Sequence, residues 1–300
     1  MKKVIFDTDI GDDIDDAFAL AALLAEPAAQ LVGVTTVYRN TVQRAQIAAA
    51  MLYAAGASDV PVYAGESIPI KEPIRPFAWE DDRELEKKRV CQWSEEYAAY
   101  PVRTGAAEFL AQSAERFGSE LTVFAVGPLT NLAQAIRRYP ASMKKIGEIR
   151  TMGGSFASVR PEWNILCDPE AADTVYSSGI PVYAVGLDVT MRCSLDETLL
   201  SRVAASPRAT NKLLSLWYGR WSEHFRFPKS VMHDPLAVAS AFTQVCRFEK
   251  PFVRADLEET RGAMLCRSTP QAGYSPVNVA EDVDRDAFYA WLGERLGCKG

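Results

Sequence analysis

The chain has few of the residues that build two common kinds of site. It contains two histidines, and its six cysteines are scattered without a Cys-x-x-Cys pair. This spacing argues against a zinc site and against a disulfide framework, and it favours reduced thiols in a cytoplasmic protein. No apolar run approaches the roughly 20 residues that a membrane-spanning helix needs. Met1-Lys2-Lys3 leads straight into an expected strand, so we expect no signal peptide.

Basic clusters are missing as well. The formal net charge is −6 at pH 7, and no patch of lysine and arginine is evident, which argues against nucleic acid as a partner. The sequence also lacks internal repeats, linkers and low-complexity tracts. With 300 residues, of which 48% are hydrophobic, the chain can bury a large core. We therefore expect a single domain over residues 1–300, with no membrane partner.

Carboxylates, in contrast, are concentrated near the amino terminus. Val4–Phe6 reads as a buried strand and Ala17–Leu24 as a helix. Six acids lie between them: Asp7, Asp9, Asp12, Asp13, Asp15 and Asp16. Carboxylates this close repel one another unless a cation or protons neutralise them, and hard oxygen ligands suit Ca²⁺ or Mg²⁺. In an open α/β sheet the carboxyl ends of the strands bind ligands, so we expect a metal site here.

A purely structural interpretation accounts for only part of this run. Acidic residues at a helix amino terminus cap free N–H groups and complement the helix dipole, which suits Asp12 and Asp13. It does not explain Asp7 and Asp9, which flank the end of a strand. An EF-hand loop is excluded, because counting from Asp7 its sixth and twelfth positions are not glycine and glutamate.

Strand-like and helix-like segments alternate along the chain. This order predicts an α/β fold with a mainly parallel central sheet flanked by helices on both faces. Residues 66–103 are irregular and charged, and we interpret them as a flap or insertion. The expected strands are 4–6, 31–37, 60–63, 121–126, 146–152 and 182–185, and the expected helices are 16–26, 41–55, 104–116, 129–138, 168–178, 196–204 and 236–242.

Two glycine-containing turns follow expected strands. Gly127–Asn131 reads as a strand-to-helix turn with Thr130 or Asn131 as cap, or as a turn whose backbone carbonyl ligates a hard cation. Met152-Gly153-Gly154 ends the next strand, where glycine allows close backbone approach to a ligand. Both turns are expected at the same edge of the sheet as the acids.

Two later segments carry polar side chains. Glu162 and Asn164 alternate around Trp163, so in an extended segment both point the same way, an arrangement suited to vicinal hydroxyls. Further along, His233-Asp234 precedes an apolar helix, where Asp234 is either a helix cap or another metal ligand.

Taken together, these segments resemble the calcium-dependent nucleoside hydrolases, the inosine–uridine-preferring nucleoside N-ribohydrolase family. The resemblance covers nearly the whole chain. It rests on seven stretches in order: Asp7-Thr8-Asp9 with Gly11 and Asp15-Asp16-Ala17; Asn40; Gly127-Pro128-Leu129-Thr130-Asn131; Met152-Gly153-Gly154; Glu162-Trp163-Asn164 with Asp168-Pro169-Glu170-Ala171-Ala172; Gly186-Leu187-Asp188-Val189-Thr190; and His233-Asp234-Pro235-Leu236-Ala237.

The resemblance implies a Rossmann-like nucleoside hydrolase fold, a homodimer or homotetramer, and cleavage of a nucleoside to ribose and free base. It implies Ca²⁺ as cofactor, with Asp9 also taking a proton from the attacking water. The implied metal ligands are Asp9, Asp16, the carbonyl of Thr130, and Asp234. The implied substrate-binding residues are Asp15, Asn40, Met152, Glu162, Asn164 and His233, and the implied catalytic set is Asp9, Asn164 and His233, with His233 near the departing base.

Some alternatives stay open at this point. The family has two fewer residues between Gly11 and its paired aspartates, so Asp12-Asp13 compete with Asp15-Asp16 for that role. The family's flap histidine and the asparagine after its paired glycines are absent, which leaves the preferred base undetermined. A non-catalytic relative that binds ribose or calcium is a second reading. A haloacid-dehalogenase-type phosphatase is a third, although it would need Gly-Thr after Asp9.

Overall fold

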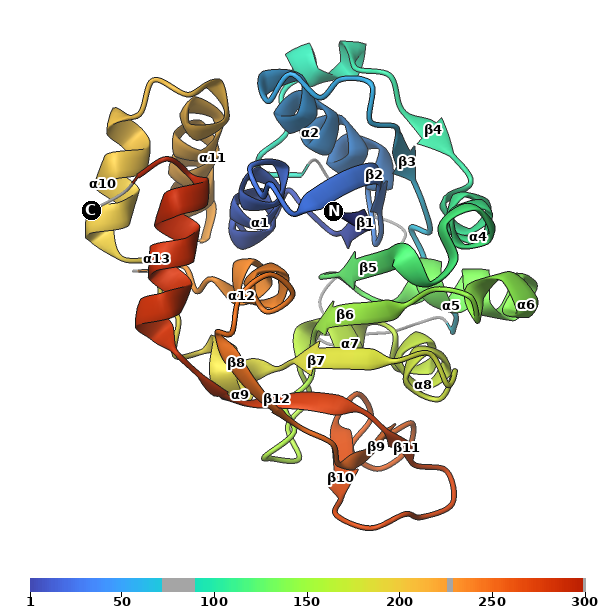
Figure 1. Cartoon of the computed structure of the whole chain (residues 1–300). Coiled ribbons are helices and arrows are strands. Elements are labelled where there is room, and N and C mark those ends of the chain that lie inside the picture. Colours follow the sequence, from blue (N-terminus) through green and yellow to red (C-terminus); the bar gives the residue numbers. More distant parts are fainter. Residues whose placement is uncertain (72–89, 226–228, 299–300) are drawn as a thin grey trace.

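A large sheet runs through the centre of the molecule (Figure 1). The computed structural model describes residues 1–71, 90–225 and 229–298, and within these residues the sheet has nine strands in the order β4-β3-β2-β1-β5-β6-β7-β12-β8. Every pairing is parallel except that of β12 with β8. The strands are β1 (Lys2–Thr8), β2 (Ala29–Thr36), β3 (Val62–Ala64), β4 (Arg103–Thr104), β5 (Leu121–Ala125), β6 (Glu148–Met152), β7 (Val182–Val185), β8 (Cys246–Glu249) and β12 (Asn278–Val283).

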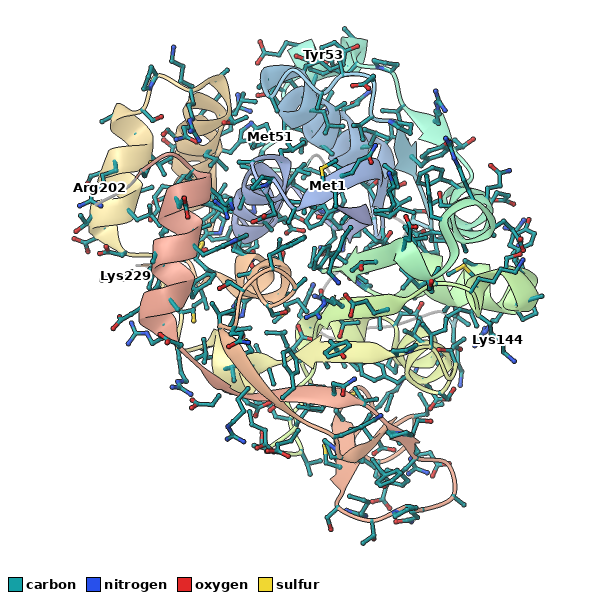
Figure 2. All side chains as sticks on the ribbon, viewed as in Figure 1. Met1, Met51, Tyr53, Lys144, Arg202 and Lys229 are labelled. Atoms are coloured by element: carbon teal, nitrogen blue, oxygen red, sulfur yellow. The ribbon has the colours of Figure 1, made fainter. Side chains whose placement is uncertain are left out.

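Helices cover both faces of this sheet, each face over its own apolar cluster. One layer is built from α1 (Asp15–Leu24), α2 (Thr41–Ala54), α10 (Glu197–Ala205), α11 (Ala209–Phe225), α12 (His233–Ala239) and α13 (Arg285–Arg295). The opposite layer is built from α4 (Ala106–Phe117), α5 (Thr130–Arg138), α6 (Pro140–Met143) and α8 (Pro169–Tyr176). On α2, Met51 is buried and Tyr53 is exposed, as expected for a helix with one face on the core (Figure 2).

Shorter elements complete the chain. The helices α7 (Trp163–Cys167) and α9 (Leu187–Thr190) follow β6 and β7, and η1 (Glu95–Ala99) and η2 (Gly118–Glu120) are 3-10 turns. A separate antiparallel sheet contains β9 (Phe252–Ala255), β10 (Met264–Arg267) and β11 (Ser275–Pro276). None of the helices within the described ranges combines the length and apolar character needed to cross a bilayer.

The predicted fold class is confirmed: the chain is an α/β domain with a mainly parallel sheet between helices. The predicted strands and helices all occur, with ends shifted by a few residues. The prediction that 66–103 is irregular is wrong in part, because η1 forms there and β4 pairs with β3. Residues 72–89 of the predicted flap lie outside the described residues. We predicted no strand or helix after residue 242.

The strand order reverses beside β1, which is where an open α/β sheet is expected to bind ligands. The chain builds β1, β2, β3 and β4 outward on one side, then returns to place β5 on the other side of β1. At such a reversal the connections after neighbouring strands diverge, which opens a crevice beyond their carboxyl ends. The acidic run after β1 and the turn after β5 both lie at this edge.

Asn131 ties three of these strand ends together. It is fully buried, and its Nδ2 donates to Asp7 Oδ1 at 2.7 Å and to the Thr36 carbonyl at 3.0 Å. Its Oδ1 accepts the Glu66 backbone N–H at 2.8 Å. The prediction that Thr130 or Asn131 caps the following helix is therefore wrong, since the N-cap is Leu129 and no side chain caps it. The amide is used instead to satisfy buried groups on neighbouring strands.

We predict that Asn131→Ala lowers the free energy of unfolding by about 3 kcal/mol, because it leaves several buried polar groups unpaired. Denaturant unfolding followed by circular dichroism measures the loss. Asn278→Ala is the matched control: its half-buried amide makes one hydrogen bond, to the Val182 carbonyl at 3.0 Å, so about 1 kcal/mol is expected. Equal losses in the two variants would contradict the role given to Asn131.

Candidate active site

Three buried carboxylates meet at the carboxyl edge of the sheet. Asp15 and Asp16 begin α1, and Asp234 is in the first turn of α12, which packs against α1. One oxygen from each of the three lies within 4.8 Å of the others. Asp15 Oδ2 also accepts the backbone N–H of Asp234 at 3.1 Å, which connects the two helix starts. Asp234 is therefore not the helix cap, because Met232 occupies that position.

Charge repulsion makes this cluster unfavourable when it is fully ionised. Burial, and then the neighbouring aspartates, raise the pKa of Asp15 and Asp234 well above the usual range. Burial also raises the pKa of Asp16 well above that range, although the Thr8 hydroxyl donates a hydrogen bond to it. Three hard oxygen donors in a buried position fit a divalent cation such as Ca²⁺ or Mg²⁺, which would balance the charge that protons otherwise neutralise.

Asp9 follows β1 directly and lies half-buried beside this cluster. Gly127 makes its position possible, because a Cβ atom at residue 127 would stand 2.8 Å from Asp9 Oδ1 and 2.9 Å from its backbone nitrogen. Burial raises the pKa of Asp9 to about 6, although Arg44 pulls in the other direction. A carboxyl group with a pKa near neutrality suits a general base.

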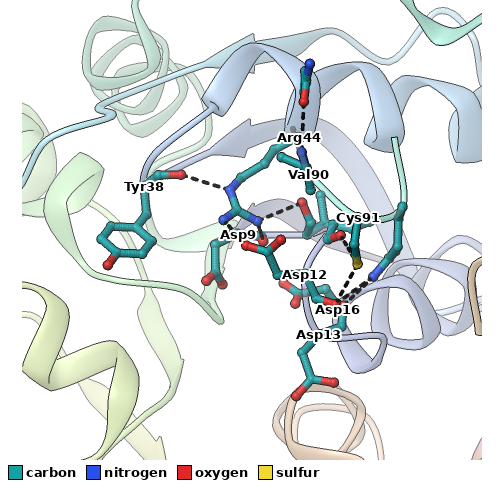
Figure 3. A network of polar contacts seen from close by, with 12 residues as sticks. Asp9, Asp12, Asp13, Asp16, Tyr38, Arg44, Val90 and Cys91 are labelled. Atoms are coloured by element: carbon teal, nitrogen blue, oxygen red, sulfur yellow. Dashed lines mark hydrogen bonds and ion pairs between the residues drawn. The ribbon is translucent and has the colours of Figure 1, made fainter. Parts of the chain in front are cut away.

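Arg44 of α2 binds the loop that carries these acids (Figure 3). Its guanidinium is almost fully buried; it donates to the carbonyls of Asp9 and Ile10 and forms an ion pair with Asp12 at 2.7 Å. Its Nε donates to the Tyr38 carbonyl at 2.8 Å. Burial opposes ionisation of Asp12, but this guanidinium holds the pKa of Asp12 below its usual value.

Arg44 therefore separates the two candidate aspartate pairs. Asp12 belongs to the ion pair, and Asp13 is a charged neighbour of Asp15 outside the close group of three, whereas Asp15 and Asp16 lie with Asp234. The backbone of this loop is also held by a residue outside it, since Gln92 Nε2 donates to the Asp13 carbonyl at 2.6 Å. This geometry favours Asp15-Asp16 as the paired aspartates of the family motif.

Glu162 and Asn164 lie in a different local structure from the one predicted. They are not in an extended segment: Glu162 is the N-cap of α7 and Asn164 is in its first turn. The Glu162 carboxylate accepts backbone N–H groups from Gly154, Asn164 and Ile165 at 2.9, 3.0 and 3.2 Å. Burial nevertheless raises its pKa. Gly154 adopts a φ of +87°, a conformation that glycine reaches without strain.

The Asn164 amide connects two strand ends. Its Nδ2 donates to the Val126 carbonyl at 2.8 Å and to the Met152 carbonyl at 3.1 Å. Because both amide N–H groups are used, the Asn164 side-chain oxygen is left to meet a ligand, and Met152 itself is buried with its carbonyl already paired. Both residues do lie at the predicted edge, after β5 and β6.

Asn40 and Thr130 also lie at strand ends, after β2 and β5. Asn40 is half-buried and caps α2, its Oδ1 accepting the Gln43 N–H at 3.2 Å, which leaves its NH₂ group for other partners. Thr130 is buried, and its hydroxyl donates to Asp168 Oδ2 at 2.7 Å. The predicted role of the Thr130 carbonyl stays a prediction.

His233 begins α12 beside the acid cluster. It is half-buried, and its Nδ1 lies 2.7 Å from the Thr190 hydroxyl oxygen. Burial lowers the pKa of His233 to about 4, so its ring is neutral near pH 7. A neutral ring offers one N–H donor, and it does not act as a strong acid.

Sequence reasoning missed two contributors to this edge. Arg44 is the one cationic residue of an alanine-rich helix, which is a weak sequence signal for a role in the site. Asp188 lies within a quoted motif, yet its role needed the fold: its carboxylate accepts the N–H groups of Phe156 at 2.7 Å and Ala157 at 3.1 Å and so holds the loop after β6. Neither contact is local in sequence.

Comparison with known proteins agrees with this arrangement. The chain matches the model of the inosine-uridine preferring nucleoside hydrolases over residues 4–290. Uridine nucleosidase 1 of Arabidopsis thaliana is 33% identical over 323 residues, covering 98% of this chain and 93% of that protein. A non-specific ribonucleoside hydrolase of Salmonella agona is 31% identical over 306 residues, covering 98% and 97%.

Solved structures show the same likeness. The purine-preferring ribonucleoside hydrolase from Gardnerella vaginalis superposes with a TM-score of 0.81 at 27% identity, covering 98% of each chain. With a family match along nearly its whole length and relatives above 30% identity, the chain belongs to the inosine-uridine preferring nucleoside hydrolase family, as its motifs predicted.

Proposed function

We propose that this protein hydrolyses the N-glycosidic bond of ribonucleosides to ribose and free base, with a Ca²⁺ ion held at the acid cluster. The observation that carries the proposal is the meeting of Asp15, Asp16 and Asp234 beside Asp9, at the sheet edge where this family's motifs converge. The family relation supports ribonucleosides as the substrate class and disfavours the phosphatase alternative.

The cation would be held by Asp9, Asp16, Asp234 and the carbonyl of Thr130. All four offer hard oxygen, the donor type that Ca²⁺ prefers. When bound, the ion supplies Lewis-acid activation of a water molecule and an anchor for two ribose hydroxyls. The tight cluster of three carboxylates also includes Asp15, which we assign to a ribose hydroxyl.

The protein's own groups perform the proton transfer and hold the sugar. Asp9 accepts the proton of the attacking water, and its raised pKa suits that role. Positive charge that develops on the ribose ring in the transition state is stabilised by the surrounding carboxylates. Asn40 offers its NH₂ group and Asn164 its side-chain oxygen to ribose hydroxyls, which makes Asn164 part of the catalytic set.

Glu162 is assigned to the 5′ hydroxyl. The buried Glu162 carboxylate already accepts backbone N–H groups of Gly154, Asn164 and Ile165, and an ionised carboxylate is an acceptor to which a hydroxyl donates. Those backbone bonds also fix the direction of the carboxylate before substrate arrives. Met152 ends β6 at the same edge and is proposed to line the sugar site.

The base preference is the part that the relatives leave open. The relatives named above are described as a uridine nucleosidase, a non-specific hydrolase and a purine-preferring hydrolase. A ribose-release screen over purine, pyrimidine and nicotinamide ribosides, in Ca²⁺ and after chelation, therefore tests the function directly. Calcium binding without ribose release from any riboside would favour a non-catalytic relative, and phosphate release from p-nitrophenyl phosphate would favour a phosphatase.

Two further proposals concern the cellular location and the oligomeric state of the protein. A cytoplasmic location is supported by the six cysteines, all of which are free thiols. A homodimer or homotetramer is proposed from the family resemblance alone, and sedimentation of the purified protein tests it.

We predict that Asp9→Asn lowers kcat by about 10²–10⁴-fold, because loss of a general base costs this much. The KM for the best riboside should change far less. Steady-state kinetics in saturating Ca²⁺ measures both values, and calcium affinity is measured in parallel. Turnover near that of the wild type would show that Asp9 is not the base.

We predict that Asp16→Asn weakens Ca²⁺ binding by at least about 100-fold in calorimetry, because a buried anionic ligand is lost. Asp12→Asn is the matched control. Its charge is paired with Arg44, so a change of about threefold or less is expected. The reverse ranking would assign the paired-aspartate role to Asp12 and Asp13.

We predict that Ca²⁺ raises the melting temperature more at about pH 8 than at about pH 5.5. The pKa values of Asp15, Asp16 and Asp234 are raised in the folded protein, so without the ion it binds more protons than the unfolded chain. Its stability therefore falls as pH rises through these pKa values, whereas the ion-bound protein avoids this loss. Scanning calorimetry with Ca²⁺ or EDTA measures the difference, and an equal gain at both pH values would contradict the prediction.

A further inference from the structure

Thr190 is a buried residue that meets the one histidine of the site. It is fully buried at the end of α9, the short helix that follows β7. Its hydroxyl oxygen lies 2.7 Å from His233 Nδ1. A backbone bond ties α9 to the turn after β6, since the Leu187 N–H donates to the Gly154 carbonyl at 2.8 Å. The contact therefore joins the carboxyl end of β7 to the start of α12.

The direction of this hydrogen bond follows from the surroundings of the hydroxyl. Within residues 1–71, 90–225 and 229–298, Thr190 Oγ1 has no hydrogen-bond partner except His233. If Nδ1 carried the proton and donated it, the hydroxyl hydrogen of a fully buried threonine would have no acceptor. Buried donors are almost always paired, so the hydroxyl donates and Nδ1 accepts.

The donating hydroxyl determines the tautomer of the ring. A neutral imidazole that accepts at Nδ1 carries its hydrogen on Nε2. Among the described residues, Nε2 has no hydrogen-bond partner, and the ring is half-buried at the edge where the acids meet. The residue that precedes Asp234 of the acid cluster thus carries an N–H donor with no partner among the described residues.

We propose that Thr190 is a positioning residue that holds His233 as the Nε2–H tautomer, so that His233 donates a hydrogen bond to the departing base. This inference rests on the proposed function and deepens it. The proton stays on Nε2: the neutral ring stabilises negative charge as it develops on a nitrogen or oxygen of the base, without transferring a proton to it. The ligand class that would recognise this donor is a nucleobase with an acceptor atom near the glycosidic bond.

Nitrogen NMR tests the tautomer directly. The chain has two histidines, so ¹⁵N-labelled protein gives two sets of imidazole signals, and His224→Gln identifies those of His233. We expect a protonated Nε2 and an unprotonated Nδ1 for His233 in the wild type. A protonated Nδ1 would overturn the proposal, and this measurement needs no change at Thr190.

Matched variants test the role of Thr190 in turnover. Thr190→Val removes the hydroxyl at nearly constant volume, and Thr190→Ser keeps it. We expect Thr190→Val to mix the two tautomers and to lower kcat for inosine about fivefold, with KM nearly unchanged and Thr190→Ser close to wild type. p-Nitrophenyl riboside has a leaving group that needs no such donor, so it should lose less than about twofold.

The outcomes separate this inference from the proposed function. An unchanged His233 tautomer in Thr190→Val, or equal losses on inosine and on the nitrophenyl substrate, would overturn the role of Thr190. If the wild type releases ribose from no riboside, the proposed function fails, whereas the NMR result still decides the tautomer. If Thr190→Val does not fold, the wild-type spectrum still decides the proposal, since a protonated Nδ1 on His233 would overturn it.

Discussion

Repulsion between buried carboxylates is the constraint on which the site depends. Six acids occupy residues 7 to 16, and the fold gives them different partners. Asp12 is paired with Arg44, and Asp7 receives hydrogen bonds from Thr35 of β2 and Asn131 of α5. Asp15 and Asp16 remain with Asp234, and among the described residues none of the three forms a salt bridge. This leaves a local excess of negative charge that a divalent cation can balance.

Amide and carboxylate side chains hold the rim of this site rigid. Asn131 joins the ends of β1 and β2 to the segment after β3, and Asn164 joins the ends of β5 and β6. Glu162 gathers three N–H groups at the start of α7. Residues that face a ligand are more precise when their own conformations are locked by such bonds. The same side chains thus support the fold and are proposed to meet substrate, Asn164 through its side-chain oxygen and Glu162 through its carboxylate.

Arg44 and His233 are both positioned by contacts with residues that are distant in the sequence. Arg44 reaches from α2 to the carbonyls of the β1–α1 loop. His233 comes from α12 and meets Thr190, 43 residues earlier in the chain. Both contacts join elements that are far apart in the sequence, so they depend on the topology of the sheet. Small shifts of α9 or α2 would therefore change the site without altering any residue proposed to touch substrate.

The sequence by itself determined the fold class, the positions of the first strands and helices, and the family, because these follow from local apolar patterns and from motifs kept in order. It also located the acids at a strand end. Only the tertiary structure decided which acids share a cluster, since Asp234 lies 218 residues beyond Asp16 and the choice between Asp12 and Asp16 depends on Arg44. It also gave Asn131 and Glu162 hydrogen-bond partners that we did not predict, because buried polar groups bind the backbone that folding places beside them, and no spacing rule encodes that partner.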